Sequence, residues 1–176
     1  MIHELYKRIE EQGLWDKTIT IERNAYLKIA GTIDTNLFYI VSGSLKISII
    51  DEAEEHIIRF GYKNNFITAL DSFITGEPSE FYIQAIKKTQ LKVISKERYL
   101  KLINENQELK IIWDLLLQQL LLQQIEREKD ILITSPQKRY HRVLLRSPQL
   151  FQEIPSKYIA SYLRMSPETF SRLKRS

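Results

Sequence analysis

The sequence contains no cysteine, and this absence excludes several kinds of site at once. Disulfides, thiolate zinc centres, iron–sulfur clusters and cysteine nucleophiles all require that residue. Three histidines are present, but His3, His56 and His141 lie far apart in the sequence, so the clustered ligands that a metal site needs are missing too. The sequence therefore predicts neither a metal site nor another cofactor.

Long apolar runs and the common nucleotide-binding loops are also missing. No segment approaches the roughly 18 consecutive apolar residues of a membrane span, and the N-terminus lacks the basic-then-apolar pattern of a signal peptide. The sequence has no P-loop, no GxGxxG and no nucleophile elbow. A β-roll enzyme would lack a convergent set of catalytic groups. We therefore expect a cytoplasmic protein that is not an enzyme and has no membrane contact.

The charge of the chain is divided unevenly between its two ends. Residues 136–176 contain nine Lys and Arg but only two acids, which gives this segment a net charge of +7, whereas the other 135 residues have a net charge of −3. A basic module on an acidic body is typical of a protein that meets a polyanion such as nucleic acid. Basic chain ends are also common in lysine-rich proteomes, so charge alone leaves both interpretations open.

The hydrophobic pattern predicts an α+β protein. Residues 2–13 have helical spacing, and residues 18–94 then change to the alternation of short strands, which indicates a sandwich or jelly-roll barrel. The clearest strand signal is Leu37–Ile47, which we interpret as a hairpin with Gly43 at its tight turn.

A long helix is predicted from about 107 to 133, and its middle is apolar on almost every side. Such a helix must be covered on more than one face. Leu115, Leu122 and Ile125 belong to a series with the spacing of a coiled-coil seam. We favour a helix shared between two subunits, because a small barrel covers only one face; the alternative is the central helix of a monomeric core.

The sequence Ser135-Pro136 restarts the chain with a helix cap and a proline at the first helical position. The charge also changes sign here. We therefore predict two domains: residues 1–134, a β-roll with the central dimerisation helix, and residues 135–176, a small helical domain.

The last stretch, residues 154–176, has the pattern of a helix-turn-helix DNA reader. Ile159, Ala160 and Leu163 line the inner face of the first predicted helix. Phe170 and Leu173 line the inner face of the second. Ser166 is the expected cap of the second helix, and Pro167 opens it.

Polar residues of the second helix share the face opposite this apolar pair, namely Glu168, Ser171, Arg172 and Arg175. Arginine can donate two hydrogen bonds to guanine in the major groove, and glutamate can accept one from the cytosine amino group. The plainer alternative for Glu168 and Arg172 is an ordinary ion pair within the helix. Arg139 and Lys174 are candidates for phosphate contacts.

A β-roll, a long central helix and a C-terminal helix-turn-helix together resemble the layout of the Crp/Fnr family of transcription regulators, in the version common in Bacteroidota. The segments that carry the resemblance are 38–46, 158–163 and 166–172. The resemblance implies a homodimer on the central helix, an N-terminal sensor roll and a winged helix-turn-helix bound to double-stranded DNA. It also implies base contacts by Glu168 and Arg172, with Ser171 beside them, and backbone contacts by Ser166 and Thr169. It allows RNA polymerase as a further partner.

The sequence departs from the family pattern in three places. The cyclic-nucleotide cassette has Thr68-Ala69 where the family has Gly-Glu, and Ser79-Glu80 where it has the phosphate-binding Arg-Ser or Arg-Thr. Arg164 stands where the turn usually has glycine, which costs about 1 kcal/mol if that residue needs a positive φ. Only residues 147–154 separate the basic helix from the reader, and the sequence ends at Ser176, so we expect the wing to be small or absent.

The sequence therefore predicts a dimeric Crp/Fnr-type regulator that reads a palindromic site and is not controlled by cyclic AMP. The effector is left open. The alternative is a degenerate sensor or scaffold module that acts through protein contacts without sequence-specific DNA binding.

Overall fold

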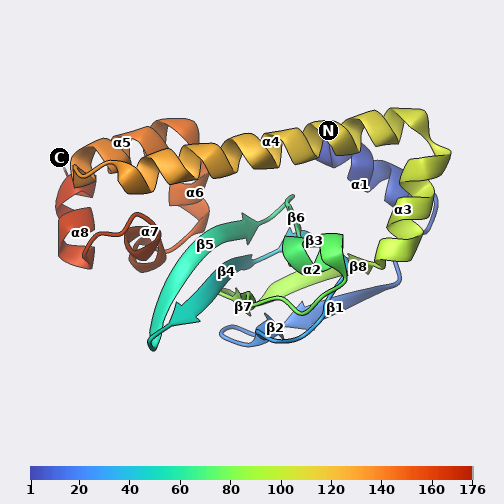
Figure 1. The fold of residues 1–176 in the computed structure, drawn as a ribbon, viewed down its shortest axis with the longest axis horizontal. Coiled ribbons are helices and arrows are strands. Elements are labelled where there is room, and N and C mark those ends of the chain that lie inside the picture. Colours follow the sequence, from blue (N-terminus) through green and yellow to red (C-terminus); the bar gives the residue numbers. More distant parts are fainter. Residues whose placement is uncertain (176) are drawn as a thin grey trace.

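The computed structural model describes residues 1–175, and within them eight strands form two stacked four-stranded sheets (Figure 1). The predicted period-two segments all contain strands, and every strand pair is antiparallel. The first sheet has the order β1 (Lys17–Ile21), β8 (Thr89–Ile94), β3 (Leu37–Ser42) and β6 (Phe66–Ile67). The second has the order β2 (Tyr26–Lys28), β7 (Tyr82–Ala85), β4 (Ser44–Asp51) and β5 (Glu54–Tyr62).

The helices surround this roll on one side and at both ends (Figure 1). The longest, α4, lies along one side of the roll, with α1 and α3 at one end of it and α5 to α8 at the other. Their bounds are α1 (Ile2–Glu11), α2 (Leu70–Thr75), α3 (Lys96–Glu105), α4 (Gln107–Leu132), α5 (Pro136–Arg146), α6 (Pro148–Glu153), α7 (Ser156–Tyr162) and α8 (Pro167–Arg175).

Gly43 does not turn a hairpin, so that sequence-based expectation is wrong. The strands on either side of it, β3 and β4, belong to different sheets, and Gly43 is the corner at which the chain crosses from one sheet to the other. Its φ is +89°, and a Cβ atom there would lie 2.4 Å from the carbonyl oxygen of Lys88. Both the positive φ and the close backbone approach require glycine.

The tight hairpin joins β4 to β5 instead, where Asp51 pairs with Glu54. The two turn residues, Glu52 and Ala53, have φ angles of 47° and 67°. A two-residue hairpin favours positive φ at both positions, which asparagine and glycine usually provide. This sequence has glutamate and alanine there; Asp51-Glu52 marks the break between the two strand patterns, but the dipeptide typical of a two-residue hairpin is missing.

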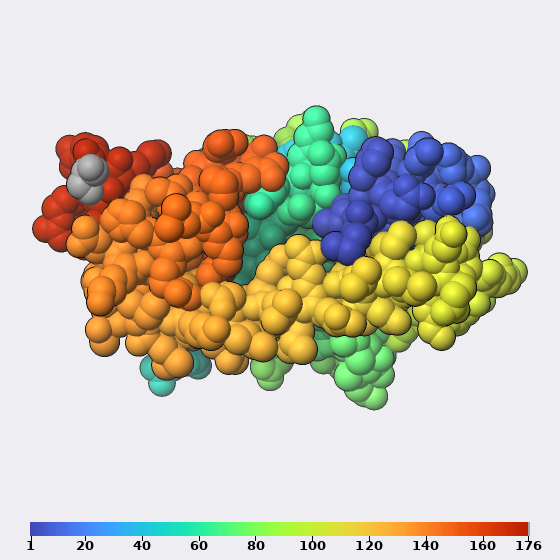
Figure 2. Space-filling view, turned by 90° about the horizontal axis from the view of Figure 1, so that it is seen from above, coloured from blue at the N-terminus to red at the C-terminus, as the bar shows by residue number. Residues whose placement is uncertain are grey.

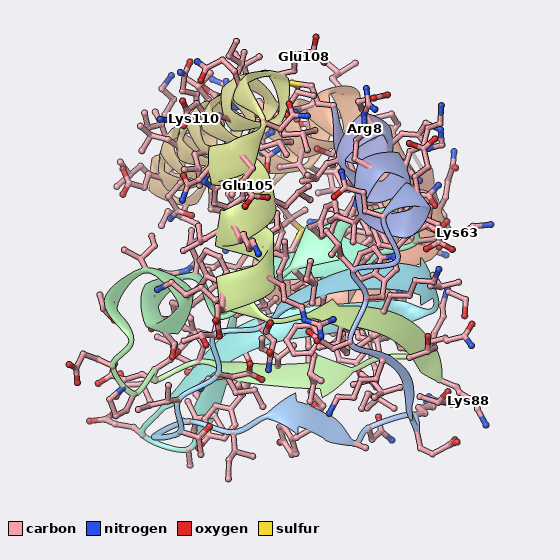
Figure 3. The ribbon with its side chains drawn as sticks, turned by 90° about the vertical axis from the view of Figure 1, so that its right-hand side faces the viewer. Arg8, Lys63, Lys88, Glu105, Glu108 and Lys110 are labelled. Atoms are coloured by element: carbon pink, nitrogen blue, oxygen red, sulfur yellow. The ribbon has the colours of Figure 1, made fainter. Side chains whose placement is uncertain are left out.

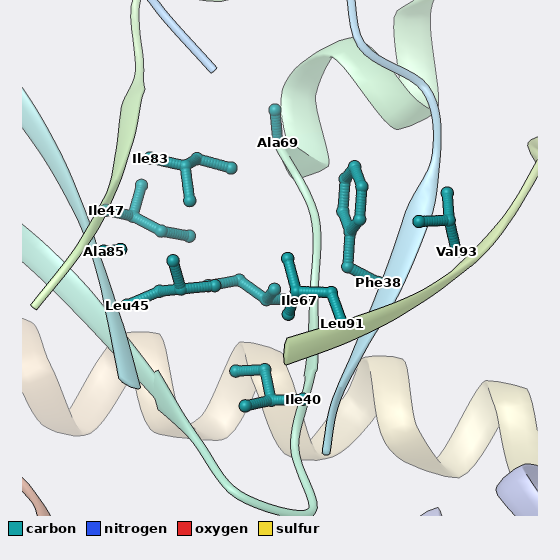
Figure 4. Close-up of a cluster of buried hydrophobic side chains, with 10 residues drawn as sticks. All are labelled: Phe38, Ile40, Leu45, Ile47, Ile67, Ala69, Ile83, Ala85, Leu91 and Val93. Carbon is teal, nitrogen blue, oxygen red and sulfur yellow. The ribbon is translucent and has the colours of Figure 1, made fainter. Parts of the chain in front are cut away.

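The interior of the roll is filled by apolar side chains from both sheets, as Figure 4 shows. The cluster consists of Phe38, Ile40, Leu45, Ile47, Ile67, Ala69, Ile83, Ala85, Leu91 and Val93. A second cluster joins the first sheet to α1, α3 and the start of α4, with Tyr99 fully buried in it. In Figure 3, α1 and α3 lie next to each other above the sheets, and charged side chains such as Lys63, Lys88 and Glu108 point outward.

A third cluster holds α5 to α8 together and also includes the roll residues Ile86, Phe60 and Tyr62. The helix α6 was not predicted from the sequence. It begins where Ser147-Pro148 ends α5, because a proline that breaks one helix can open the next at its first position. All regular elements described after Ile94 are helices.

Candidate functional site

The helices α7 and α8 are joined by a tight turn at residues 163–166. Ser166 caps α8 as predicted: its Oγ accepts a hydrogen bond from the Thr169 backbone N–H at 3.2 Å. Arg164 has a φ of 50°, the left-handed conformation expected if it takes the place of a glycine. The Met165 N–H donates to the Ala160 carbonyl at 3.0 Å, which closes the turn.

The apolar side of α8 is buried in the third cluster. Phe170 is 2% exposed, and its ring centroid lies 5.6 Å from that of Tyr140 and 6.2 Å from that of Phe151. Burial of a phenylalanine contributes about 2–3 kcal/mol, so these contacts fix the rotation of α8 about its axis. The opposite side of the helix is thereby directed to solvent.

That outer side presents the predicted readers. Glu168, Ser171, Arg172 and Arg175 are exposed, and Thr169 is half-buried. The pKa of Glu168 is lowered by hydrogen bonds from its own backbone N–H and from Ser166, and Arg172 is not among the causes. Glu168 is thus an exposed, ionised acceptor, and the hydrogen bonds at the start of α8 favour its charged form further.

Of the two predicted phosphate contacts, only Lys174 lies at the surface. It is exposed, and its Nζ lies 3.5 Å from the Ser156 Oγ, beside an open cavity of about 260 Å³. Arg139 is only 8% exposed, and four of the five N–H groups of its guanidinium donate to backbone carbonyls, so little of the group is left at the surface for a phosphate. The expectation that Arg139 contacts phosphate is therefore wrong; the residue ties the end of α4 to the turn between α7 and α8.

A charge cluster around one buried aspartate connects α4 to α5. Asp130 is fully buried and accepts hydrogen bonds from Arg142, at 3.0 Å, and from Arg146. Glu126, one turn earlier on α4, accepts from Arg142 at 2.8 Å. The sequence signal was the i,i+4 spacing of these residues on two consecutive helices, but spacing alone could not show that the helices pack against each other.

Arg127 connects the roll to α7. Its guanidinium carbon lies 3.9 Å from the centre of the Tyr162 ring, and its Nη2 donates to the Ile57 carbonyl on β5 at 3.4 Å. Burial lowers the pKa of Arg127. The same α7 face meets β4, where the Lys46 Nζ lies 5.0 Å from the centre of the Tyr158 ring. The two predicted domains are thus in direct contact through α7.

The predicted dimer residues lie on an uncovered face of α4. Leu115, Leu122 and Ile125 are 43%, 63% and 40% exposed. Leu121 and Leu132 on the same helix are also exposed. The helix faces the viewer along its whole length in Figure 2. One side of α4 packs on the roll through Ile112 and Leu116, so this apolar surface is what remains on the other.

The residues predicted as the degenerate ligand cassette flank α2, and none of them contributes a cation. The Thr68 Oγ1 donates to the Asn36 carbonyl at 2.8 Å, and Ala69 is buried. Ser79 is 1% exposed, and its Oγ accepts from the Phe81 N–H at 3.1 Å. Glu80 is exposed.

The family model that matches this sequence is described as the cyclic nucleotide-binding domain, and it covers residues 18–106, from β1 to the last turn of α3. The chain belongs to the cyclic nucleotide-binding domain family. A search of curated protein sequences gives no match.

Solved structures of Crp/Fnr-family regulators share the fold of this family member. FixK2 from Bradyrhizobium japonicum is 12% identical with a TM-score of 0.77, and the match covers 90% of this chain and 82% of that one. The c-di-GMP-responsive global regulator CLP from Xanthomonas campestris is 16% identical with a TM-score of 0.69, covering 98% and 90%. The catabolite activator protein of Thermus thermophilus is 18% identical with a TM-score of 0.60, covering 98% and 81%.

The described residues contain neither a metal-binding cluster nor a membrane-spanning helix. Within residues 1–175, His, Asp and Glu side chains form no group of three that could hold a metal ion. No helix of these residues is long and apolar enough to cross a membrane.

Proposed function

We propose that the protein is a homodimeric transcription regulator of the Crp/Fnr type that reads a two-fold symmetric DNA site. In this proposal residues 1–134 form the sensor-like and dimerising part. Residues 135–176 form the DNA-binding part, a helix-turn-helix made of α7 and α8. The fold shared with known regulators over nearly the whole chain supports this role.

The observation that carries the proposal is the outer face of α8. Phe170 anchors one side of the helix in the core, and the other side presents Glu168, Ser171, Arg172 and Arg175 to solvent. The Glu168 carboxylate can accept a hydrogen bond from cytosine, and the two guanidinium groups can donate to guanine. The Ser171 hydroxyl can bond to donors or acceptors of a base. Ser166 and Thr169 at the start of α8, and Lys174 near its end, would contact the DNA backbone.

The dimer is proposed on the uncovered face of α4. Exposed leucines such as Leu121 and Leu122, both more than 60% exposed, leave apolar area in contact with water along the helix. A contiguous patch of this kind marks an interaction site. A two-fold dimer through α4 would bury it, and it would place two copies of α8 to read half-sites about one helical turn apart.

We further propose that cyclic AMP does not control the protein. A cyclic phosphate buried in the roll needs its charge neutralised, and an arginine fork usually does this. Ser79 and Glu80 stand at that position here, and Glu80 would repel the phosphate. The interior of the roll is also filled with apolar side chains (Figure 4). Isothermal titration should therefore show no saturable heat with cyclic AMP at micromolar concentration.

Selection from a pool of random DNA duplexes tests the main proposal. We expect enrichment of two-fold symmetric sequences, and loss of that enrichment in R172A while general DNA affinity persists. Lys101→Ala, an exposed substitution on α3, is the matched control and should select the same sites as the natural protein. If the natural protein enriches no sequence and binds all duplexes equally weakly, a scaffold that acts through protein contacts is the better conclusion.

A further inference from the structure

A buried lysine lies beside the cassette, and sequence reasoning did not single it out. Lys28 is the last residue of β2 and is only 4% exposed. Lysine is rarely buried to this extent unless its charge is compensated. Burial lowers the pKa of Lys28, and the charges of Asp71 and Asp34 oppose that effect from a distance.

Three backbone carbonyls surround its amino group. The Nζ donates to the oxygens of Ile29 at 3.0 Å, Ser79 at 3.2 Å and Phe81 at 3.1 Å. An ammonium has three N–H donors and no acceptor, so three carbonyls satisfy it completely. A neutral amine has only two N–H donors, and its lone pair would face the third carbonyl. The geometry therefore matches a cation, not an uncharged amine.

Two of these carbonyls belong to the chain that follows α2 in the cassette. The same segment is joined to the loop after β2 by the backbone: the Gly31 N–H donates to the Ser79 carbonyl at 2.9 Å, and the Ser79 N–H donates to the Thr32 carbonyl at 3.1 Å. The Phe81 N–H is bonded within the segment, to the Ser79 Oγ. The ammonium of Lys28 thus lies at the centre of a closed set of hydrogen bonds that includes residues 79–81.

We propose that the three carbonyls form a binding site for a primary ammonium, that the Lys28 side chain fills it, and that this internal cation holds the cassette segment 79–81 closed without an effector. The proposal rests on the proposed function, since it gives the physical reason for a roll that does not respond to cyclic nucleotides. Lys28 is a buried cation beside the cassette, but its three N–H donors are all bonded to carbonyls. An anionic ligand would have to break those bonds to reach it.

Hydrogen exchange on the full chain, followed by mass spectrometry, tests the closure. K28M keeps most of the side-chain length but removes the donors: the Ile29 and Phe81 carbonyls lose this partner, and the Ser79 carbonyl keeps only its bond from the Gly31 N–H. We expect exchange in peptides covering residues 76–82 to accelerate about tenfold or more, while peptides of α7 and α8 keep their protection. K17M, at an exposed position on β1, is the control and should change neither region.

Chemical rescue of K28A tests whether the three carbonyls bind a primary ammonium. This second test remains informative even if K28M does not fold. The ion n-propylammonium carries the three carbons and the nitrogen that this substitution removes, and n-propanol has a similar size without the charge. We expect n-propylammonium to restore protection of residues 76–82, or the folded yield if K28A is unfolded, and n-propanol to have no such effect. Equal rescue by both compounds, or by neither, overturns the proposal, as does exchange in K28M that matches K17M.

DNA selection with the natural protein is independent of these variants. A failure of the Lys28 proposal therefore leaves enriched symmetric sites in place. A failure of the proposed function instead removes the enrichment but leaves the K28A rescue as it is.

Discussion

Replacing Arg139 with methionine separates a structural role from a DNA contact. The guanidinium joins the end of α4, at the carbonyls of Ile133 and Thr134, to the turn of the reader, at the carbonyls of Leu163 and Arg164. Methionine preserves much of the aliphatic stem but none of the donors. The turn carbonyls then lose their partners, in a region where Leu163 is fully buried.

The magnitude follows from the two turn carbonyls. A buried acceptor left unsatisfied costs about 1–3 kcal/mol, whereas the carbonyl of exposed Thr134 can recruit water. Two turn carbonyls at about 1.5 kcal/mol each give a loss of about 3 kcal/mol in the free energy of unfolding. Arg164 is held in a left-handed conformation next to this contact, so the turn would also lose its fixed shape and specific DNA affinity would fall.

The assay is urea unfolding at one fixed protein concentration, together with DNA binding over a range of salt concentrations. Lys138→Met is the control, because Lys138 is the exposed neighbour of Arg139 and should change stability by no more than about 0.5 kcal/mol. A phosphate contact would behave in the opposite way. The structural reasoning is refuted if R139M has the same urea midpoint as the natural protein and only reduces, by about 1, the slope of log DNA affinity against log salt concentration.

Three further perturbations follow from single residues. Leu122→Lys places a charge on the uncovered face of α4 and should give monomers in analytical ultracentrifugation; a natural protein that is already monomeric at micromolar concentration contradicts the dimer. Arg172→Ala should cost about 1–3 kcal/mol on a specific site and relax the preference at one base pair, and an equal loss on random DNA would show that it does not read a base. Tyr99→Phe should leave stability unchanged or raise it by about 1 kcal/mol in thermal unfolding, because the buried Tyr99 hydroxyl has no hydrogen-bond partner in the structure; a loss of 2 kcal/mol or more would reveal a partner.

Local patterns predicted the elements well where one physical signal dominated. Alternating β-branched residues identified the strands, and the Ser135-Pro136 cap identified the start of α5, where the Ser135 Oγ accepts from the Lys138 N–H at 3.3 Å. Arg164, where glycine is usual in the resembling family, takes the positive φ that this position was expected to need. Such features depend on a few neighbouring residues, so the sequence contains the information.

Features that depend on packing between distant segments could not be predicted in the same way. Gly43 has the local appearance of a hairpin turn, but its role as a corner depends on the approach of Lys88 and Thr89 from another part of the chain. In the sequence, Arg139 and Lys28 look like ordinary surface cations. Only folding brings the carbonyls of residues 163–164 to Arg139 and those of residues 79 and 81 to Lys28. A buried cation bonded to carbonyls leaves no mark in the sequence.

Bonds that form only in the folded chain also change how many Lys and Arg side chains of residues 136–176 we expect to contact DNA phosphates. The nine bases of residues 136–176 include Arg139, which is bonded to carbonyls, and Arg142 and Arg146, which are paired with acids of α4. Those three hold the helices together. The remaining six are Lys138, Lys157, Arg164, Arg172, Lys174 and Arg175, and in the structure all of them are exposed. Because the salt dependence of DNA affinity scales with the number of phosphates neutralised, these six are the bases of residues 136–175 that we expect to contribute to the proposed binding. Specific recognition then depends more heavily on the orientation of α8, and therefore on the buried contacts of Phe170 and Arg139 that set it.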